Sequence, residues 1–244
     1  GKCGKVDINR YINIYARRRM LMDKYIPGVK TVLRRHMIEV PLCIRNASGI
    51  RIFGRRIKSL AFTTDVAVIK NINSDAIIAV YPFTPQPTIT QAITMAADIP
   101  VFCGVGGGTT SDKRRVVNLA LDAEFKGAMG VVVNAPTPND TIRAMRGVIE
   151  IPIVVTVVSE HTDFRARLEA GANILNVSGA AKTAQIVRKI RDEFPEVPII
   201  ATGGPNDDTI LETISAGANA ITYTPPTPAD LFKGLMEKYR DELA

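Results

Sequence analysis

The sequence PIIATGG at residues 198–204 is one of several similar apolar stretches that decide the fold. Others are GVVVNAP (130–136), PIVVTVV (152–158) and NILNVSG (173–179). Each stretch is an apolar run rich in Val and Ile that leads into small, polar or glycine residues. Runs without a polar alternation are typical of parallel strands, which are covered on both faces. The pattern therefore predicts buried parallel strands.

The same pattern extends in both directions along the chain, and a polar cap and an amphipathic segment follow each run. Strand and helix alternate eight times, which predicts a closed (β/α)8 or TIM barrel of the α/β class. An open doubly wound sheet is the alternative, but no GxGxxG motif opens the first unit. The expected strands are 59–64, 76–82, 100–106, 130–136, 152–158, 173–179, 198–204 and 220–226. The expected helices begin near Asp65, Pro87, Ser111, Pro138, Thr162, Thr183, Asp207 and Thr227.

Two parts of the chain differ in charge, and we expect a basic extension at 1–58 and the barrel at 59–244. The extension holds 15 Lys and Arg against three acids, a net charge of +12, whereas the remainder carries −5. This split indicates an anionic partner: nucleic acid bound through residues 1–58, a phosphorylated ligand, or the acidic surface of another subunit. Short strands or a hairpin are expected over 37–57, either closing the bottom of the barrel or reaching a second subunit.

A helix is expected from Asp7 to about Tyr25, with an apolar stripe that would pack on protein and make the molecule a homo-oligomer. The stripe consists of Ile8, Tyr11, Ile12, Tyr15 and Met22.

Composition narrows the class of protein. The chain has 244 residues, 46% of them hydrophobic, and no apolar run reaches the roughly 20 residues that span a bilayer. No signal peptide is recognisable in GKCGKVDINR. The cysteines at 3, 43 and 103 form neither a disulfide framework nor a zinc motif. We therefore expect a cytoplasmic protein without membrane contact.

The carboxyl ends of the strands are where a (β/α)8 barrel places its ligand. Here these ends are rich in hydroxyls, amides and glycines, which suit the oxygens of a small ligand. No strand carries a lysine for a Schiff base, no His/Asp/Glu cluster has metal-ligand spacing, and no GxSxG elbow occurs. We expect neither a metal nor an organic cofactor. The expected substrate-binding residues are Thr64, Gly106, Gly107, Asn134, Asn176 and Ser178.

A phosphate group is expected at the turn after the seventh strand, within Ala201–Asn206. Its glycines let backbone N–H groups approach an anion, and a helix begins directly afterwards. The alternative is that the two glycines only form a tight turn. The expected phosphate-binding residues are Thr202, Gly203, Gly204, Thr222, Tyr223 and Thr224.

A second anion-binding candidate is the loop 104–115, in which four glycines precede a helix start. Lys113, Arg114 and Arg115 lie in the first helical turn, where positive charge opposes the helix dipole. The loop is either a mobile lid over an anionic ligand or a solvated surface loop.

Three ionisable residues follow strands and are the expected acid–base catalysts: Asp65, Glu160 and His161. Asp65 could instead cap a helix, and Glu160 could merely neutralise His161. Cys103 lies within an apolar run and is expected to be a structural thiol.

From the sixth strand onward the chain resembles the ribulose-phosphate-binding barrels, through Glu169–Val177, Val197–Gly204 and Ala216–Ile221. One departure is Thr222–Thr227, where many members have Gly-Ser. A looser likeness is to the glycerol uptake operon antiterminator regulators, which bind a sugar-alcohol phosphate. The resemblance implies a lyase or isomerase of a small phosphorylated metabolite. The alternative is a non-catalytic regulator that binds such a metabolite and uses its basic leader to contact nucleic acid or a partner.

Overall fold

The structure is a computed structural model that describes residues 27–29, 32–33 and 37–243. The helix expected over 7–25 lies outside these residues. Residues 37–243 belong to one compact unit that contains the whole barrel.

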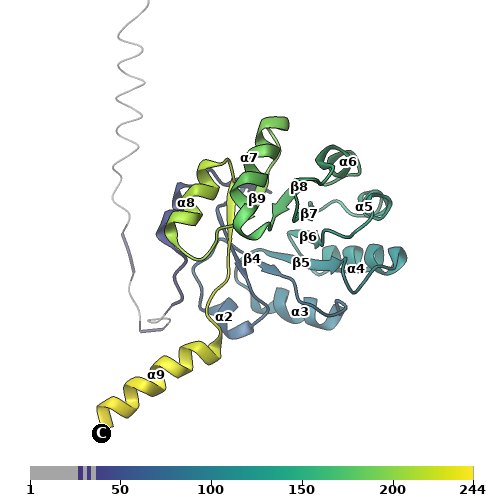
Figure 1. The fold of residues 1–244 in the computed structure, drawn as a ribbon. Helices are drawn as coiled ribbons and strands as arrows, with labels where there is room; N and C mark the ends of the chain where they lie inside the picture. Colours follow the sequence, from purple (N-terminus) through teal and green to yellow (C-terminus); the bar gives the residue numbers. More distant parts are fainter. Residues whose placement is uncertain (1–26, 30–31, 34–36, 244) are drawn as a thin grey trace, which may run out of the picture. The chain divides into compact units, whose positions relative to one another are not determined.

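Eight parallel strands close into a barrel, which confirms the fold expected from the sequence (Figure 1). The last strand pairs with the first, Ile221 standing opposite Ser59, so the barrel has no open edge. Each strand begins within one residue of its expected start and ends at least one residue early in most cases, because the terminal glycine, proline and polar residues form the loops. The strands are β3 (Ser59–Phe62), β4 (Ala76–Ala79), β5 (Val101–Gly106), β6 (Gly130–Val133), β7 (Ile153–Val157), β8 (Ile174–Val177), β9 (Ile199–Thr202) and β10 (Ala220–Tyr223).

A helix follows each strand of the barrel, close to the expected position. Asp65, Asp112, Asp163 and Asn206 cap four of these helices by accepting a backbone N–H of the first turn. The helices are α2 (Val66–Lys70), α3 (Pro87–Ala96), α4 (Lys113–Phe125), α5 (Asn139–Arg146), α6 (Phe164–Glu169), α7 (Thr183–Glu193), α8 (Asp207–Ser215) and α9 (Pro228–Leu243), with short 3-10 helices η1 (Leu42–Asn46) and η2 (Ala180–Lys182).

The core has two layers, because successive side chains of a strand point to opposite faces. The outer layer packs the strands against the helices, with Val155, Val177 and Ile221 among its members. The inner layer fills the barrel, with Val154 and Ala220 among its members.

A hairpin closes the amino-terminal end of the barrel. It pairs β1 (Ile50–Ile52) with β2 (Arg55–Ile57), and its isoleucines join the inner layer of the core. The chain then enters β3 directly at Ser59, so the hairpin lies at the end opposite the ligand-binding loops. Of the two arrangements expected for 37–57, the structure has the hairpin at the bottom of the barrel.

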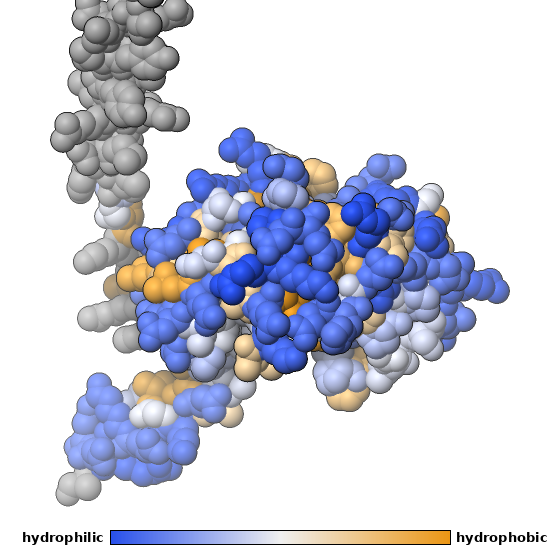
Figure 2. All heavy atoms as spheres, turned by 45° about the horizontal axis from the view of Figure 1, so that its top comes forward, coloured by the Kyte–Doolittle hydropathy of each residue, from blue (hydrophilic) through white to orange (hydrophobic). Residues whose placement is uncertain are grey.

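Helix α9 has no buried residue, whereas each of the barrel helices α2 to α8 has at least one. Figure 2 shows apolar side chains gathered along one side of this helix and charged side chains along the other. Among the described residues, no helix has the length and apolar character needed to cross a membrane.

Candidate ligand site at the mouth of the barrel

Polar side chains from the last four strands line one half of the barrel mouth. Thr156, Asn176, Thr202 and Thr222 each follow, by two residues, a residue of the inner core layer: Val154, Ile174, Ile200 and Ala220. Since side chains alternate along a strand, these four point into the barrel above that layer. We call them the polar ring.

Two buried atoms of the polar ring have no hydrogen-bond partner. They are Asn176 Oδ1 and Thr222 Oγ1, on residues that are 9% and 8% exposed. The amide nitrogen of Asn176 donates to Thr156 Oγ1 at 3.4 Å, so only its oxygen is left over. An unpaired buried polar atom costs about 1–3 kcal/mol, which a bound ligand or water would recover. The ring is therefore suited to a ligand with hydroxyl or amide-like groups.

The other half of the mouth is a cavity of about 240 Å³ formed by β4, β5 and β6 with their loops. It brings together three of the expected substrate-binding residues, Gly106, Gly107 and Asn134. Thr64 and Ser178 are not part of its wall. Tyr81 is its one ionisable side chain, and the phenol oxygen accepts the Gln86 N–H at 3.0 Å, which leaves the phenol proton free to be donated. The complete lining is Val80, Tyr81, Pro82, Phe83, Pro85, Gly104, Gly106, Gly107, Gly108, Thr109 and Asn134.

Glycine is required where the loop after β5 crosses β6. Gly107 has φ +88°, and a Cβ there would lie 2.7 Å from both Asn134 Cβ and Thr137 Oγ1. At Gly106 a Cβ would meet Val116 Cγ2 at 2.5 Å. The glycines expected from sequence to form a ligand-binding loop therefore also permit close packing of the backbone on its neighbours.

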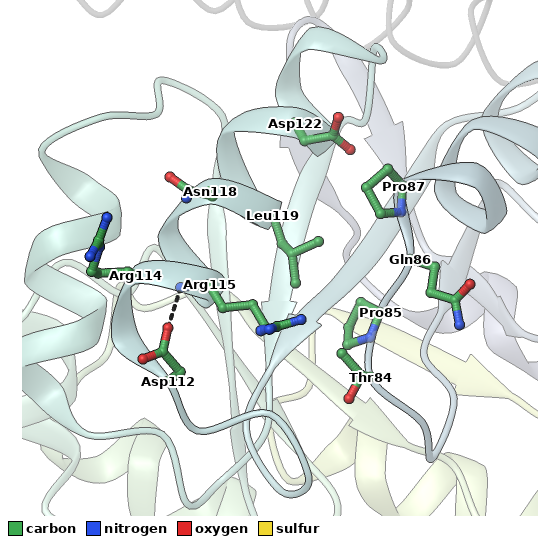
Figure 3. Close-up of a pocket in the computed structure, with 10 residues that line it drawn as sticks. All are labelled: Thr84, Pro85, Gln86, Pro87, Asp112, Arg114, Arg115, Asn118, Leu119 and Asp122. Carbon is green, nitrogen blue, oxygen red and sulfur yellow. Dashed lines mark hydrogen bonds between the residues drawn. The ribbon is translucent and has the colours of Figure 1, made fainter.

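A second groove of about 780 Å³ lies between α4 and the loop before α3, and shares Pro85 with the cavity. In Figure 3, Arg115 reaches across it toward Thr84 and Pro85, whereas Arg114 points the other way. Asp112 caps α4 by accepting the Arg115 N–H at 2.7 Å. Lys113 pairs with Asp140 on α5 at 3.0 Å. Of the three basic residues considered for anion binding, Arg115 reaches across this groove, Arg114 borders it but points away, and Lys113 pairs with α5.

The turn expected to bind phosphate is closely packed. Gly203 donates its N–H to Thr222 O at 3.3 Å, and a Cβ there would meet Ile210 and Ile221 at 2.7 Å. Gly204 has φ +88° and is exposed. The glycine pair thus forms a tight turn that presents Gly204 to solvent.

Helix α8, which follows this turn, already satisfies its own amino terminus. Asn206 and Thr209 form a reciprocal capping box. Asp207 and Asp208 place two carboxylates in the first turn, which disfavours a further anion at this helix end.

The last strand separates the expected phosphate-binding residues between two faces. Thr222 belongs to the polar ring, whereas Tyr223 packs against the outer layer of the core. Thr224 is exposed just beyond the strand.

The expected acid–base residues lie at strand ends but have other partners. Asp65 caps α2 by accepting the Val68 N–H at 3.0 Å. Glu160 accepts from Lys182 Nζ at 3.2 Å and from Gln185 Nε2 at 2.7 Å, so both carboxylate oxygens face η2 and α7. His161 is 86% exposed, and its Nε2 lies 3.8 Å from Glu160. These partners match the alternative roles of helix capping and charge neutralisation.

Two residues of the mouth, Tyr81 and Thr156, were not among the expected site residues. Both stand at the carboxyl ends of strands, and the strand-end rule applied without preference for carboxylates or imidazoles would have included them. Within the described part of the chain, no three His, Cys, Asp or Glu side chains are grouped as a metal site would require.

The fold and the position of the site define a (β/α)8 barrel whose ligand would bind at the carboxyl ends of the strands. No protein-family model matches the chain, and no curated protein matches its sequence. Solved structures with the same fold include mandelate oxidase, at TM-score 0.59 and 15% identity over 86% of this chain and 75% of that one. Phosphoenolpyruvate phosphomutase from Streptomyces platensis subsp. rosaceus aligns at TM-score 0.55 and 14% identity, over 75% and 80%. At such identities the similarity shows the barrel fold, and the likeness to antiterminator regulators gains no support.

Proposed function

We propose that this chain binds a small phosphorylated metabolite in the mouth of the barrel and acts on it as a lyase or isomerase. The observation that carries the proposal is the pair of buried, unpartnered atoms Asn176 Oδ1 and Thr222 Oγ1. By strand alternation both side chains point into the barrel above its inner core layer, and an unpaired buried polar atom in a native fold calls for a partner such as a ligand or an ordered water.

The polar ring would hold the oxygens of the ligand. Thr202 and Thr222 offer hydroxyls, and the exposed Gly204 offers the backbone N–H of the turn after β9. Because α8 carries Asp207 and Asp208 in its first turn, hydroxyls and this amide would hold the phosphate, with little help from the helix dipole. The carbon skeleton would then extend over Gly104–Gly108 toward Tyr81 and Phe83.

Tyr81 is the residue of the cavity wall that can move a proton during such a reaction. Its hydroxyl proton is not used in accepting the Gln86 N–H, so it can be donated to a developing oxyanion or carbanion. Asp65, Glu160 and His161 remain the competing candidates, and each would have to leave its present partner to reach the ligand.

A regulator that binds the metabolite without converting it is the second candidate. It is favoured by the absence of Asp, Glu, His, Lys and Arg from both the described cavity wall and the polar ring. A binding site needs only complementary hydrogen bonds, whereas most proton-transfer reactions need an ionisable group.

The first experiment is a screen of phosphorylated metabolites by thermal shift, followed by calorimetry on the hits. Thr222→Val should weaken binding by about tenfold, since it removes one hydrogen bond to an anionic ligand. Thr213→Val is the matched control, because that hydroxyl is buried on α8 and bonds Thr209 O. Equal affinity of Thr222→Val and the unmodified chain for every hit would contradict the proposed site.

The second experiment asks whether the bound metabolite is converted, using ³¹P and ¹H NMR at saturating ligand. For the enzyme, Tyr81→Phe should lower turnover by about a hundredfold or more with little change in affinity. A loss of turnover in Glu160→Gln or His161→Asn, with Tyr81→Phe fully active, would return the acid–base role to the loop after β7. Binding without any conversion would identify the regulator.

A further inference from the structure

The hairpin at the closed end of the barrel carries a cluster of basic side chains far from the mouth. Between Arg45 and Lys58 the sequence contains five Lys and Arg and no Asp or Glu. The four arginines of this segment are exposed: Arg45, Arg51, Arg55 and Arg56. We call these side chains, with Phe53, the hairpin face.

Two of these arginines stand directly opposite each other, Arg51 on β1 and Arg56 on β2. Like charges at opposed positions destabilise an antiparallel pair. Among the described residues no ion pair involves any arginine of the hairpin face, and the one side-chain hydrogen bond recorded there runs from Arg56 Nε to Ser48 O at 2.7 Å. The nearby Asp75 accepts the backbone N–H groups of Lys58 and Ser59 through Oδ2. Within the described part of the chain, this charge is therefore not neutralised by an ion pair.

The tip of the hairpin holds a second unfavourable residue. Phe53 and Gly54 form a two-residue loop with φ of +46° and +79°. Such a loop, with positive φ at both positions, prefers Asn-Gly, and a bulky side chain at the first position is strained. The Phe53 side chain gains no burial in return, since the residue is 70% exposed.

We propose that the hairpin face binds single-stranded nucleic acid. Exposed arginines without acidic partners match a row of phosphates, and an exposed aromatic ring between them matches a base that stacks on it. The arginines alone would be enough to bind an acidic protein surface. Such a partner would not explain why a strained Phe53 is kept at the tip of the hairpin. The site lies at the opposite end of the barrel from the polar ring, so it is independent of the proposed metabolite function.

The test measures binding of the full chain to fluorescent 20-nucleotide RNA and DNA, single-stranded and duplex, by anisotropy over a range of salt. The triple variant R51Q/R55Q/R56Q should raise the Kd for single strands at least tenfold. Its log–log salt slope should shrink by about two, as expected for three lost phosphate contacts at ~0.7 each. The control R143Q/R188Q/R240Q removes three exposed arginines from α5, α7 and α9 and should leave Kd within about twofold, apart from a small general charge effect.

The substitution Phe53→Asn distinguishes a loss of nucleic-acid binding from a loss of folding. It should raise the melting temperature by about 2 °C, because it places the preferred residue in the turn. It should at the same time weaken single-strand binding about tenfold and leave duplex binding nearly unchanged. A variant that is more stable and binds single strands as before would overturn the role of Phe53.

Two outcomes would overturn the proposal as a whole. One is the absence of salt-sensitive binding by the intact chain to any of the four oligonucleotides. The other is an unchanged Kd in the triple variant, which would assign the binding to basic residues elsewhere in the chain. If the same variant also lost binding to phosphatidylserine vesicles, the partner of the hairpin face would be a membrane surface. Among the outcomes that support it, preference for RNA or DNA would tell which polymer is bound.

Discussion

Thr222 and Asn176 illustrate, at the scale of single residues, how a site can be found from what a fold leaves unpaired. Both side chains are buried, both are polar, and each has an atom without a partner. A purely structural role would favour Val or Leu at these inward positions, as on the layer below with Ala220 and Ile174. Retention of polar atoms there is therefore the residue-level argument for a ligand.

We expect Thr222→Val to stabilise the ligand-free protein by up to about 1 kcal/mol, because it removes a buried hydroxyl that has no partner. Urea unfolding monitored by circular dichroism would measure the change. Thr213→Val should destabilise instead, since its hydroxyl donates to Thr209 O at 2.9 Å. If Thr222→Val proved the less stable of the two, its hydroxyl would have a partner within the protein and the ligand argument would lose its basis.

Cys103 provides a second prediction at this scale. Burial raises the pKa of its thiol to about 12, with a smaller contribution from Asp122. In a C3S/C43S variant we therefore expect no reaction with a thiol reagent at pH 8 while the chain is folded, and full reaction in urea. Rapid labelling of the folded variant would show that the strand exposes this thiol and would reopen a nucleophilic role for it.

At the scale of elements, a pair of arginines holds the closed end of the barrel in a repeated arrangement. Arg146 on α5 donates to Ile149 O and Asn173 Oδ1, and Arg191 on α7 donates to Val197 O and Asn219 Oδ1. Each asparagine oxygen also accepts the first N–H of a strand, at Ile153 and at Ile199. Each arginine thus joins the end of its helix to the loops that precede the next strands.

Arg191→Ala should destabilise the fold by about 3 kcal/mol, because several carbonyl groups lose a charged donor. Arg188→Ala is the matched control on the same helix, since Arg188 is exposed and should change the free energy of unfolding by less than about 0.5 kcal/mol. Denaturant unfolding of both variants measures the difference. A similar small effect in both would mean that water replaces the guanidinium at these carbonyls without loss.

At the scale of the whole molecule, α9 is the feature that a single chain does not explain. It follows the last barrel strand, yet it buries no residue (Figures 1 and 2). Its large apolar side chains fall within one arc of the helix, since successive residues are rotated by about 100°. They are Leu231, Phe232, Leu235, Met236, Tyr239 and Leu243.

We expect the chain to form a homo-oligomer in which this stripe is covered, because exposed apolar stripes of this kind mark protein interfaces. Leu235→Glu should shift the molecule toward the monomer in sedimentation equilibrium. Lys233→Glu introduces the same residue outside the stripe and should leave the oligomer intact. If the unmodified chain were a monomer at micromolar concentration, this expectation would be refuted. The same result would refute the homo-oligomer predicted from the helix expected over residues 7–25.

The amino-acid sequence by itself determined the barrel, because its signals are local and repeated. Apolar runs such as 130–136 read as strands wherever they occur, and caps such as Asp112 and Asn206 act on backbone groups three residues away. The glycines 106 and 107 and the amide of Asn134 were also identifiable, since strand ends converge at one mouth in any barrel of this kind.

Only the tertiary structure decided which of these residues are free to act. Glu160 meets Lys182 and Gln185 from the next unit, Lys113 meets Asp140, and Gly203 donates to Thr222 O, all between residues about 20 or more positions apart. Such pairings depend on how the closed barrel brings neighbouring loops together, which no local pattern encodes. The unpaired oxygens of the polar ring likewise become visible only in the folded structure, where the partners of each buried polar group can be traced.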